Sequence, residues 1–289
     1  MKKYILISGL EIHNANAMSS TITIGVPAMT AWLGAVHALE RKVRKKHILE
    51  EVRFLKVAVS YLQTDLQVYK ETGSHINSIV GTVNPLDKDG TRASFIEEPR
   101  IHLKVSLLIE AEGIEGDIED ELYQTLYKVL HVMKFAGGDV IRFKDISILY
   151  SGGETSADRK IIVKLMPGFI LIERTDLLVK ENDDSGDTLE RLLNYVAIRN
   201  VLSIENGIRR LRKSRKEKGW LVPIAVGFKG ISKLGKVENQ RDSTKPHCFV
   251  EPIVTLGEFK MAYRFTAIDD IMWHYQYIEN GQFYLCVNQ

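Results

Sequence analysis

The sequence predicts an α+β fold in which a ferredoxin-like domain, residues 1–150, is followed by an appended second lobe, residues 151–289. The first observation is the order of the apolar patterns, which is strand, helix, strand, strand, helix, strand. The second is a turn-rich polar stretch at about 65–99, which predicts a hairpin finger inserted before the third strand. The third is a set of short strand signals in the second half of the chain.

Four apolar segments predict the strands of the first domain. Residues 3–9 predict a central strand, because their apolar run is continuous rather than alternating. Residues 52–62 alternate well enough for a second strand, and residues 102–109 predict a third. Residues 139–149 supply the fourth.

Two segments with apolar residues every three or four positions predict the helices. The first covers residues 27–46, and Pro27 suits its first turn. The second covers residues 117–134, and Gly137 with Gly138 is a usual terminator for it.

The second lobe has a less regular pattern. Residues 161–172 predict strands on both sides of Pro167-Gly168, and residues 187–204 predict a helix. An apolar strand is expected at Trp220–Val226, and several short strands are expected within 246–289.

Composition limits the class of protein. The 289 residues suffice for a buried core, and no stretch approaches the roughly 20 apolar residues that a membrane helix needs. The first residues lack the long apolar region of a signal peptide, and Cys248 and Cys286 lie far apart without metal-ligand spacing. We therefore expect a cytoplasmic protein with reduced thiols, no membrane association and no cofactor.

Two basic runs stand out against a net charge of only +2. They are Arg41–Lys46, at the end of the first predicted helix, and Arg209–Lys218. Such runs are typical of a nucleic-acid interface, but also of a solvated helix face, a mobile loop or a helix end whose dipole favours cations.

The run Ile12–Ser20, Ile-His-Asn-Ala-Asn-Ala-Met-Ser-Ser, places small amides and hydroxyls in a predicted strand-to-helix turn. Such side chains bond to phosphate, sugar and base edges without catalysing a reaction. They also cap helices and stabilise turns, so a purely structural role stays open.

Five blocks in order resemble one family, the second subunit of the type I-F CRISPR RNA-guided surveillance (Csy) complex, which is that subtype's Cas-five member. The first runs from Ile12 to Val43, and a tail ending Tyr284-Leu285-Cys286 fits as well. The other four blocks are Asn84–Gly90 running on to Glu97-Glu98, Lys134–Gly138, Leu165–Phe169 and Gly219–Ile224.

The resemblance implies the same ferredoxin-like, RNA-recognition-motif (RAMP) fold and a non-catalytic role. By resemblance, the protein would grip the 5′ handle of the CRISPR guide RNA and pair with the large subunit of a Cascade complex in antiviral defence. Its finger would abut the repeated backbone subunit, and target DNA would be met through the assembled complex. The aromatic signature with which RNA-recognition motifs stack bases is not visible in this sequence, so loops and basic edges are expected to hold the RNA.

The candidate RNA-binding residues are therefore polar, basic, glycine or aromatic residues from these blocks and runs. They are Asn14, Asn16, Ser19, Ser20, Arg41, Lys134, Phe135, Gly137, Gly138, Arg209, Arg210, Arg212, Lys213 and Trp220. Gly137-Gly138 lets a backbone approach phosphate closely, or simply ends a helix. The second basic run binds phosphate or docks on an acidic face of the large subunit, and Trp220 stacks on a base or packs in the sheet core.

Two other functions stay open at this point. One is a metal-independent endoribonuclease that processes CRISPR precursor RNA, using His13 with the hydroxyl of Ser19 or Ser20. In this family a separate subunit is the ribonuclease, so the resemblance argues against catalysis. The other is a general protein-interaction module. Asp87 and Asp89 fit a tight turn better than a metal site, because the remaining calcium ligands are missing.

Overall fold

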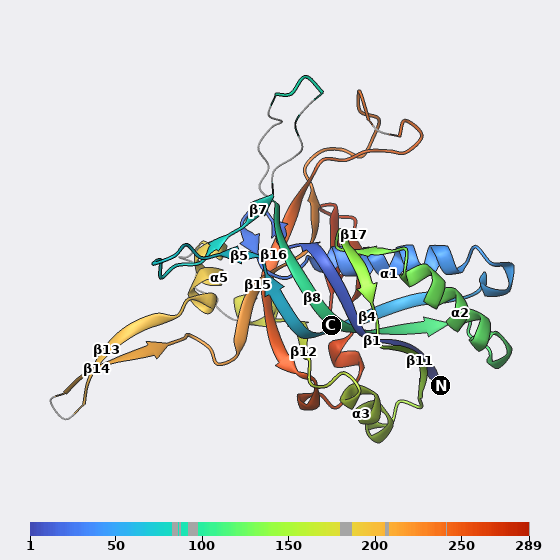
Figure 1. Cartoon of the computed structure of the whole chain (residues 1–289), viewed down its shortest axis with the longest axis horizontal. Helices are drawn as coiled ribbons and strands as arrows, with labels where there is room; N and C mark the ends of the chain where they lie inside the picture. Colours follow the sequence, from blue (N-terminus) through green and yellow to red (C-terminus); the bar gives the residue numbers. More distant parts are fainter. Residues whose placement is uncertain are drawn as a thin grey trace.

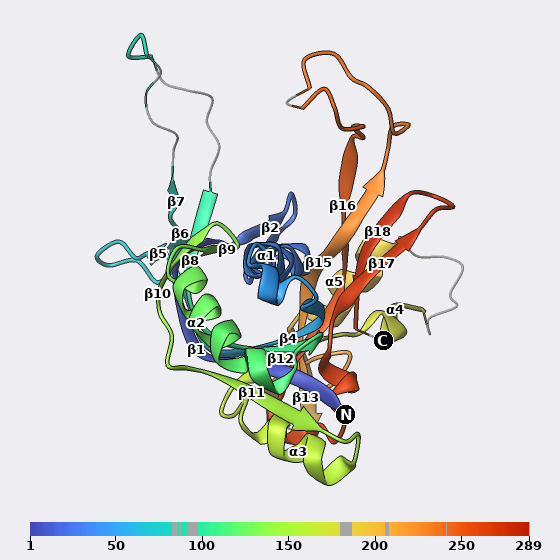
Figure 2. The same cartoon turned by 90° about the vertical axis from the view of Figure 1, so that its right-hand side faces the viewer.

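A large, curled antiparallel sheet dominates the molecule, with a few helices packed against it (Figures 1 and 2). The computed structural model describes residues 1–82, 86, 88–91, 98–179, 187–205, 208–240 and 242–288. Within these ranges the sheet has 12 strands, and its main path runs β17-β18-β15-β16-β12-β4-β8-β1-β10-β9. The fold is thus a mixture of α and β structure.

The first half of the chain contains the predicted order of elements. Its four long strands are β1 (Lys2–Asn16), β4 (Arg53–Leu66), β8 (Glu98–Glu112) and β11 (Asp145–Ser151), and its helices are α1 (Met29–Val43) and α2 (Glu119–Leu130). Strand β1 is central: β8 pairs with one side of it, and β11 and β10 (Gly138–Arg142) pair with the other. Strand β4 lies beyond β8, and every pair is antiparallel.

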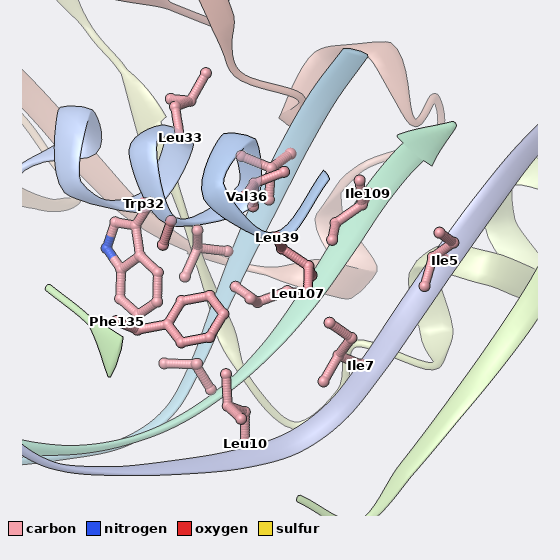
Figure 3. Packing of buried hydrophobic residues seen from close by; sticks show 14 of the residues in the cluster. Ile5, Ile7, Leu10, Trp32, Leu33, Val36, Leu39, Leu107, Ile109 and Phe135 are labelled. Atoms are coloured by element: carbon pink, nitrogen blue, oxygen red, sulfur yellow. The ribbon is translucent and has the colours of Figure 1, made fainter. Parts of the chain in front are cut away.

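The side-chain pattern explains why α1 covers this part of the sheet. Its buried residues Trp32, Leu33, Val36 and Leu39 recur at helical spacing on one face. Figure 3 shows this face above apolar side chains that project from the strands, with Phe135 beside Trp32 at a ring-centroid distance of 6.2 Å. The strand residues in that view are Ile5, Ile7, Leu10, Leu107 and Ile109. Burial of this continuous layer is the main stabilising contribution in the first half.

Three predictions for the first half need correction. The run after Ile12 is no strand-to-helix turn, because β1 continues through a bulge to Asn16. The fourth strand is divided into β10 and β11, which pair with successive parts of β1. Helix α2 ends at Leu130, so Gly137 and Gly138 belong instead to a turn between β9 (Lys134–Phe135) and β10.

Within the described ranges, the second half contributes five strands to the same sheet, together with three helices. The strands are β12 (Phe169–Glu173), β15 (Trp220–Gly230), β16 (Val250–Met261), β17 (His274–Ile278) and β18 (Phe283–Val287). The helices are α3 (Thr155–Val163), α4 (Thr175–Val179) and α5 (Thr188–Val196). A separate two-stranded hairpin consists of β13 (Arg199–Glu205) and β14 (Ile208–Ser214).

The predictions for this half were partly wrong. Residues before Pro167 form α3 rather than a strand, and the helix expected at 187–204 ends at Val196 and gives way to β13. The start of the basic run is neither a helix face nor a loop, because Arg209–Lys213 lies in β14. The strand expected at Trp220–Val226 is present as part of β15.

The two halves share one sheet and one core. Strand β12 pairs with β4 at Ser60 and Tyr61, and the backbone of Trp273 bonds to Val57 in both directions, at 2.9 and 2.8 Å. The main apolar cluster combines Trp32 and Leu107 with residues such as Ile224, Phe259 and Trp273. The division at residue 150 stays a prediction, and these contacts bind its two sides together.

Shorter elements complete the described chain. The small strands are β2 (Met18–Ser20), β3 (Thr23–Ile24), β5 (Val68–Tyr69), β6 (Ser78–Ile79) and β7 (Gly81–Thr82), and the 3-10 turns are His47–Leu49, Gly116–Ile118, Ala262–Arg264 and Asp269–Ile271. The finger expected at 65–99 falls partly on residues 83–85, 87 and 92–97, outside the described residues, and stays a prediction. No helix in the described ranges is long and apolar enough to cross a membrane.

Candidate nucleic-acid interface

A bulge in β1 presents Asn14 at the surface. Pairing with β8 is irregular between Ile12 and Ala15, and Asn14 adopts a positive φ of 56°. Asparagine tolerates this left-handed conformation better than most residues. The Asn14 N–H donates to Nδ1 of His102 at 3.0 Å, while its side chain remains exposed and has no hydrogen bond to any described residue. The local geometry thus fixes the backbone and leaves the amide available.

The side chains of Asn16, Ser19 and Ser20 form hydrogen bonds to residues close to them in the sequence. The Asn16 side chain accepts from the Met18 N–H at 2.9 Å and donates to the Met18 carbonyl at 3.0 Å. The hydroxyls of Ser19 and Ser20 both bond to Thr23, at 2.8 and 2.7 Å. The turn-forming role that the sequence left open therefore applies to these three side chains, although the Asn16 side chain stays exposed.

The β9–β10 turn packs directly against this bulge. Ala136 and Gly137 have φ values of 48° and 78°, which define a tight hairpin turn. A side chain at Gly138 would lie 2.7 Å from the Ala15 nitrogen, so only glycine fits there. The Asn16 N–H donates to the Ala136 carbonyl at 2.8 Å. Two blocks more than 100 residues apart in the sequence thus meet, and we call Asn14, Asn16, Lys134, Gly137 and Gly138 the bulge–hairpin site.

Two side chains of this turn have different environments. Lys134 is exposed and its ammonium lies 2.8 Å from the Asp139 carboxylate. Phe135 is fully buried in the core against Trp32. The Phe135 ring therefore faces away from solvent and anchors the turn on the core, and its candidate role in RNA binding stays a prediction.

The basic residues lie in two places distant from each other. Arg41 is exposed on the last turn of α1, roughly 18 Å along the axis from Met29 at 1.5 Å per residue. Its neighbours are used in ion pairs: Arg44 contacts Glu40 and Lys46 contacts Glu121. Much of that first run is therefore accounted for by ion pairs near the C-terminal end of α1, where the helix dipole favours cations.

The second run lies on the β13–β14 hairpin, which projects from the sheet in Figure 1. Arg212 pairs in register with Val201 and Lys213 with Asn200, and both basic side chains are exposed. Arg209 and Arg210 occupy the part of β14 nearer the tip, opposite Ile204 and Ser203. The hairpin carries its positive charge outside the main sheet.

Trp220 begins β15 and is 49% exposed. Its ring contacts Phe259 and Phe169, with centroids 4.9 and 5.4 Å away. The side chain thus packs on the sheet and keeps half its surface open, and its stacking on a base stays a prediction.

A polar trough that was not predicted from the sequence lies on the sheet face opposite α1, and we define it by Glu11, His13, His102, Lys104 and Arg142. These residues line a cavity of about 330 Å³, and a second cavity adjoins it and reaches Lys144 and Lys164. The alternation of polar and apolar residues in the sequence could have indicated the trough. Glu11 and His13 flank Ile12, and His102 and Lys104 flank Leu103, while Ile12 and Leu103 face the core.

A carboxylate organises the charge in the trough. Glu11 accepts from Arg142 at 2.6 and 3.1 Å and lies 2.9 Å from the Lys104 ammonium. The bonds from Arg142, followed by those from Lys104, lower the pKa of Glu11 to about 2. Glu11 therefore stays ionised at neutral pH and aligns two cations on an open sheet face.

The geometry near His13 bears on the ribonuclease alternative. The His13 ring stacks on His102 with centroids 4.4 Å apart, while the hydroxyls of Ser19 and Ser20 bond to Thr23. The pairing of His13 with a serine hydroxyl is therefore absent among the described contacts. No group of three or more His, Cys, Asp or Glu side chains in the described ranges is arranged to hold a metal ion.

Comparison with known proteins points to one family. A family model described as CRISPR-associated protein (Cas_Csy2) matches residues 5–286. The protein named CRISPR-associated protein Csy2 from Pseudomonas aeruginosa (strain UCBPP-PA14) is 30% identical over 299 residues, which cover 94% of this chain and 90% of that protein. The residues matched by the family model include the bulge–hairpin site, the trough and the basic hairpin.

Proposed function

This chain belongs to the Csy2 family of the CRISPR type I-F complex, and from that premise we propose that it is a non-catalytic RNA-binding subunit that holds the 5′ handle of the guide RNA. The observation that carries this proposal is the meeting of the exposed Asn14 amide with the exposed Gly137 on one surface, where the Asn16 N–H joins the two segments by its bond to Ala136. Amides and close-approaching glycine backbone are groups that bond to phosphates and to the edges of unpaired bases.

The proposed fold of the first half is ferredoxin-like. Strands β11, β1, β8 and β4 are adjacent in that order and antiparallel, and α1 and α2 connect them in the sequence that this fold requires. In this proposal the trough lies on the sheet face that the two helices leave open. Beside the ion pairs of Glu11, Lys144 and Lys164 in the adjoining cavity supply the positive charge that a phosphate backbone needs.

The proposed protein partners are the large subunit and the repeated backbone subunit, with target DNA met through the assembled complex. The family supports a place in a CRISPR complex. We assign the β13–β14 hairpin, which forms a two-stranded sheet of its own, to contact with the large subunit. The predicted finger at about 65–99 is assigned to contact with the repeated backbone subunit.

The test combines binding and cleavage in one experiment. The full chain is incubated with guide-repeat RNA and with a scrambled RNA of equal length, in a chelator, and complexes and products are separated on gels. We expect binding that prefers the handle and no cutting, with the His13→Ala variant also free of cutting. Specific cleavage that disappears in His13→Ala contradicts the scaffold role, and equal binding of both RNAs contradicts handle recognition.

A further inference from the structure

An apolar pocket with an aromatic wall opens beside the end of β4. Its volume is about 420 Å³, within the range of pockets that hold small organic groups. Tyr61, Phe169, Trp220 and Phe259 form the aromatic wall, and Ile24 and Val26, before α1, also line the pocket. We call these residues the aromatic pocket.

The pocket lies where β4 extends past the start of β12, which begins at Phe169 opposite Tyr61. Strand β12 pairs with β4 only at Ser60 and Tyr61. From Gln63 to Leu66, β4 continues to pair with β8 on one side, while no strand in the described part of the chain pairs with its other side. The space between this free edge and β15 is lined by Gln63, Thr64 and Leu66.

The aromatic wall is rigid and partly open. Trp220 is held edge-on to Phe169 at 5.4 Å and tilted against Phe259 at 4.9 Å, and Phe259 in turn packs edge-on against Tyr61 at 5.3 Å. A large aromatic ring that is braced by two others and still 49% exposed offers a preformed stacking surface. Little conformational entropy is then lost when a flat group binds to it.

The charge around the pocket indicates which flat group fits. The basic segment that includes Arg212 and Lys213 leads directly to Trp220, and Arg215 donates to the Gly219 carbonyl at 2.8 Å, next to the tryptophan. On the other side, Gln63 lines both the aromatic pocket and the trough of Lys104 and Arg142. The trough cations are paired with Glu11, and Asp65 also lines that cavity, so the unbalanced positive charge lies on the Trp220 side. An apolar slot beside a basic segment complements an unpaired base on its phosphate backbone better than an apolar peptide.

The rim can also read a base. Thr64 pairs in register with the core residue Leu103 and therefore lies on the pocket face of β4, whereas its neighbour Gln63 lies on the trough face. The exposed Thr64 hydroxyl lines the cavity and offers both a donor and an acceptor to a base edge.

We propose that the aromatic pocket receives one unstacked base of the single-stranded guide RNA, with Trp220 as the stacking platform and Thr64 at the edge of the base. This inference rests on the proposed function and adds to it a defined base site, distinct from the bulge–hairpin site.

The test is a cycle that combines protein variants with abasic RNA. Handle RNAs in which one nucleotide at a time lacks its base are titrated against the full chain and against Trp220→Ala. At one position, loss of the base should lower the affinity of the unmodified protein roughly 5- to 150-fold, the cost of one stacked base. In Trp220→Ala the same abasic RNA should bind no worse than the intact RNA.

Two further variants control for folding and for exposed aromatics in general. Trp220→Phe keeps a ring and should retain most of the coupling, and its thermal unfolding should stay close to that of the unmodified chain. Tyr263 is also 49% exposed but lies outside the pocket, so Tyr263→Ala should leave the coupling unchanged.

The outcomes separate this inference from the proposed function. If the handle binds no better than scrambled RNA, the proposed function fails. If the handle binds specifically but every abasic RNA loses the same affinity for the unmodified chain and for Trp220→Ala, the base site is refuted. If Trp220→Ala leaves RNA binding intact but abolishes co-purification with the other subunits, the pocket holds a protein side chain, which also overturns the inference.

Discussion

Asn14 has two separate roles, a positive φ in the β1 bulge and an exposed side-chain amide for the proposed RNA ligand. Its φ of 56° suits asparagine or glycine, and its exposed amide forms no hydrogen bond within the described part of the chain. We predict that Asn14→Gly weakens binding of handle RNA by about 1–3 kcal/mol, because a hydrogen bond is removed while its partner stays desolvated. Titration of labelled handle RNA measures this, and the free energy of unfolding should change little.

The matched variant Asn14→Ala removes the same amide but forces a Cβ into the left-handed region. It should lower the free energy of unfolding by roughly 1–2 kcal/mol beyond the Gly variant. If Asn14→Gly binds the handle as tightly as the unmodified protein, the amide has no role in RNA binding and the bulge is purely structural.

At the scale of an element, the β13–β14 hairpin carries the exposed basic side chains of Arg212 and Lys213 outside the main sheet. We predict that Arg212→Ala with Lys213→Ala lowers affinity equally for handle and scrambled RNA, because phosphate interactions carry no sequence information. The dependence of log affinity on log salt should flatten by about 0.7 for each single-strand phosphate that is no longer neutralised. Titrations at several salt concentrations measure both effects.

The control removes two equal charges from another exposed element, with Arg159→Ala and Lys160→Ala on α3. This pair should change the salt dependence much less. If the hairpin instead docks on an acidic face of the large subunit, RNA affinity hardly moves and co-purification fails. A loss confined to the handle sequence contradicts both roles.

Elements buried on both faces could be predicted from the sequence, and those defined by a bulge or a turn could not. The apolar run at 3–9 gives a strand because both of its faces are covered, and the run at 102–109 is covered in the same way from Val105 to Ile109, beyond the trough residues His102 and Lys104. The extension of β1 past His13 escaped prediction because its outward residues are polar and its register shifts at the bulge. Gly138 suggested a helix stop, whereas its conformation follows from contact with Ala15, which only the fold brings near.

The same difference applies to the candidate site. Asn14 and Gly137 could be chosen from the sequence by their residue types, and the structure brings them together. Phe135 was chosen in the same way and is buried. The trough residues Lys104 and Arg142 were not chosen, since they come from different strands and form a group only through their shared partner Glu11.

At the scale of the whole molecule, the shared core predicts one cooperative unfolding transition. Trp273 is fully buried, and its indole N–H donates to the Leu171 carbonyl at 2.8 Å. We predict that Trp273→Phe lowers the free energy of unfolding by about 1–3 kcal/mol, because the carbonyl loses its buried donor. Urea unfolding followed by circular dichroism and by tryptophan fluorescence should give a single coincident transition at a lower midpoint.

Trp220→Phe is the control for this change, since replacing the half-exposed ring should lower the free energy of unfolding much less than replacing the buried one. Two separate transitions, one of them unaffected by Trp273→Phe, indicate instead that the segments on either side of residue 150 unfold independently. That result would support the predicted domain boundary and contradict the single core.

The pairing of Val57 with Trp273 also determines how long the edge of β4 stays unpaired during synthesis of the chain. Strand β4 is complete when Leu66 has been made, but its partner Trp273 follows roughly 200 residues later. At about 5–20 residues per second, the edge of the sheet near Val57 stays uncovered for roughly 10 to 40 s of synthesis. An unpaired strand edge beside apolar side chains is prone to aggregation during that interval. Synthesis of the segment that contains Trp273 therefore determines when the edge of β4 is no longer open to aggregation.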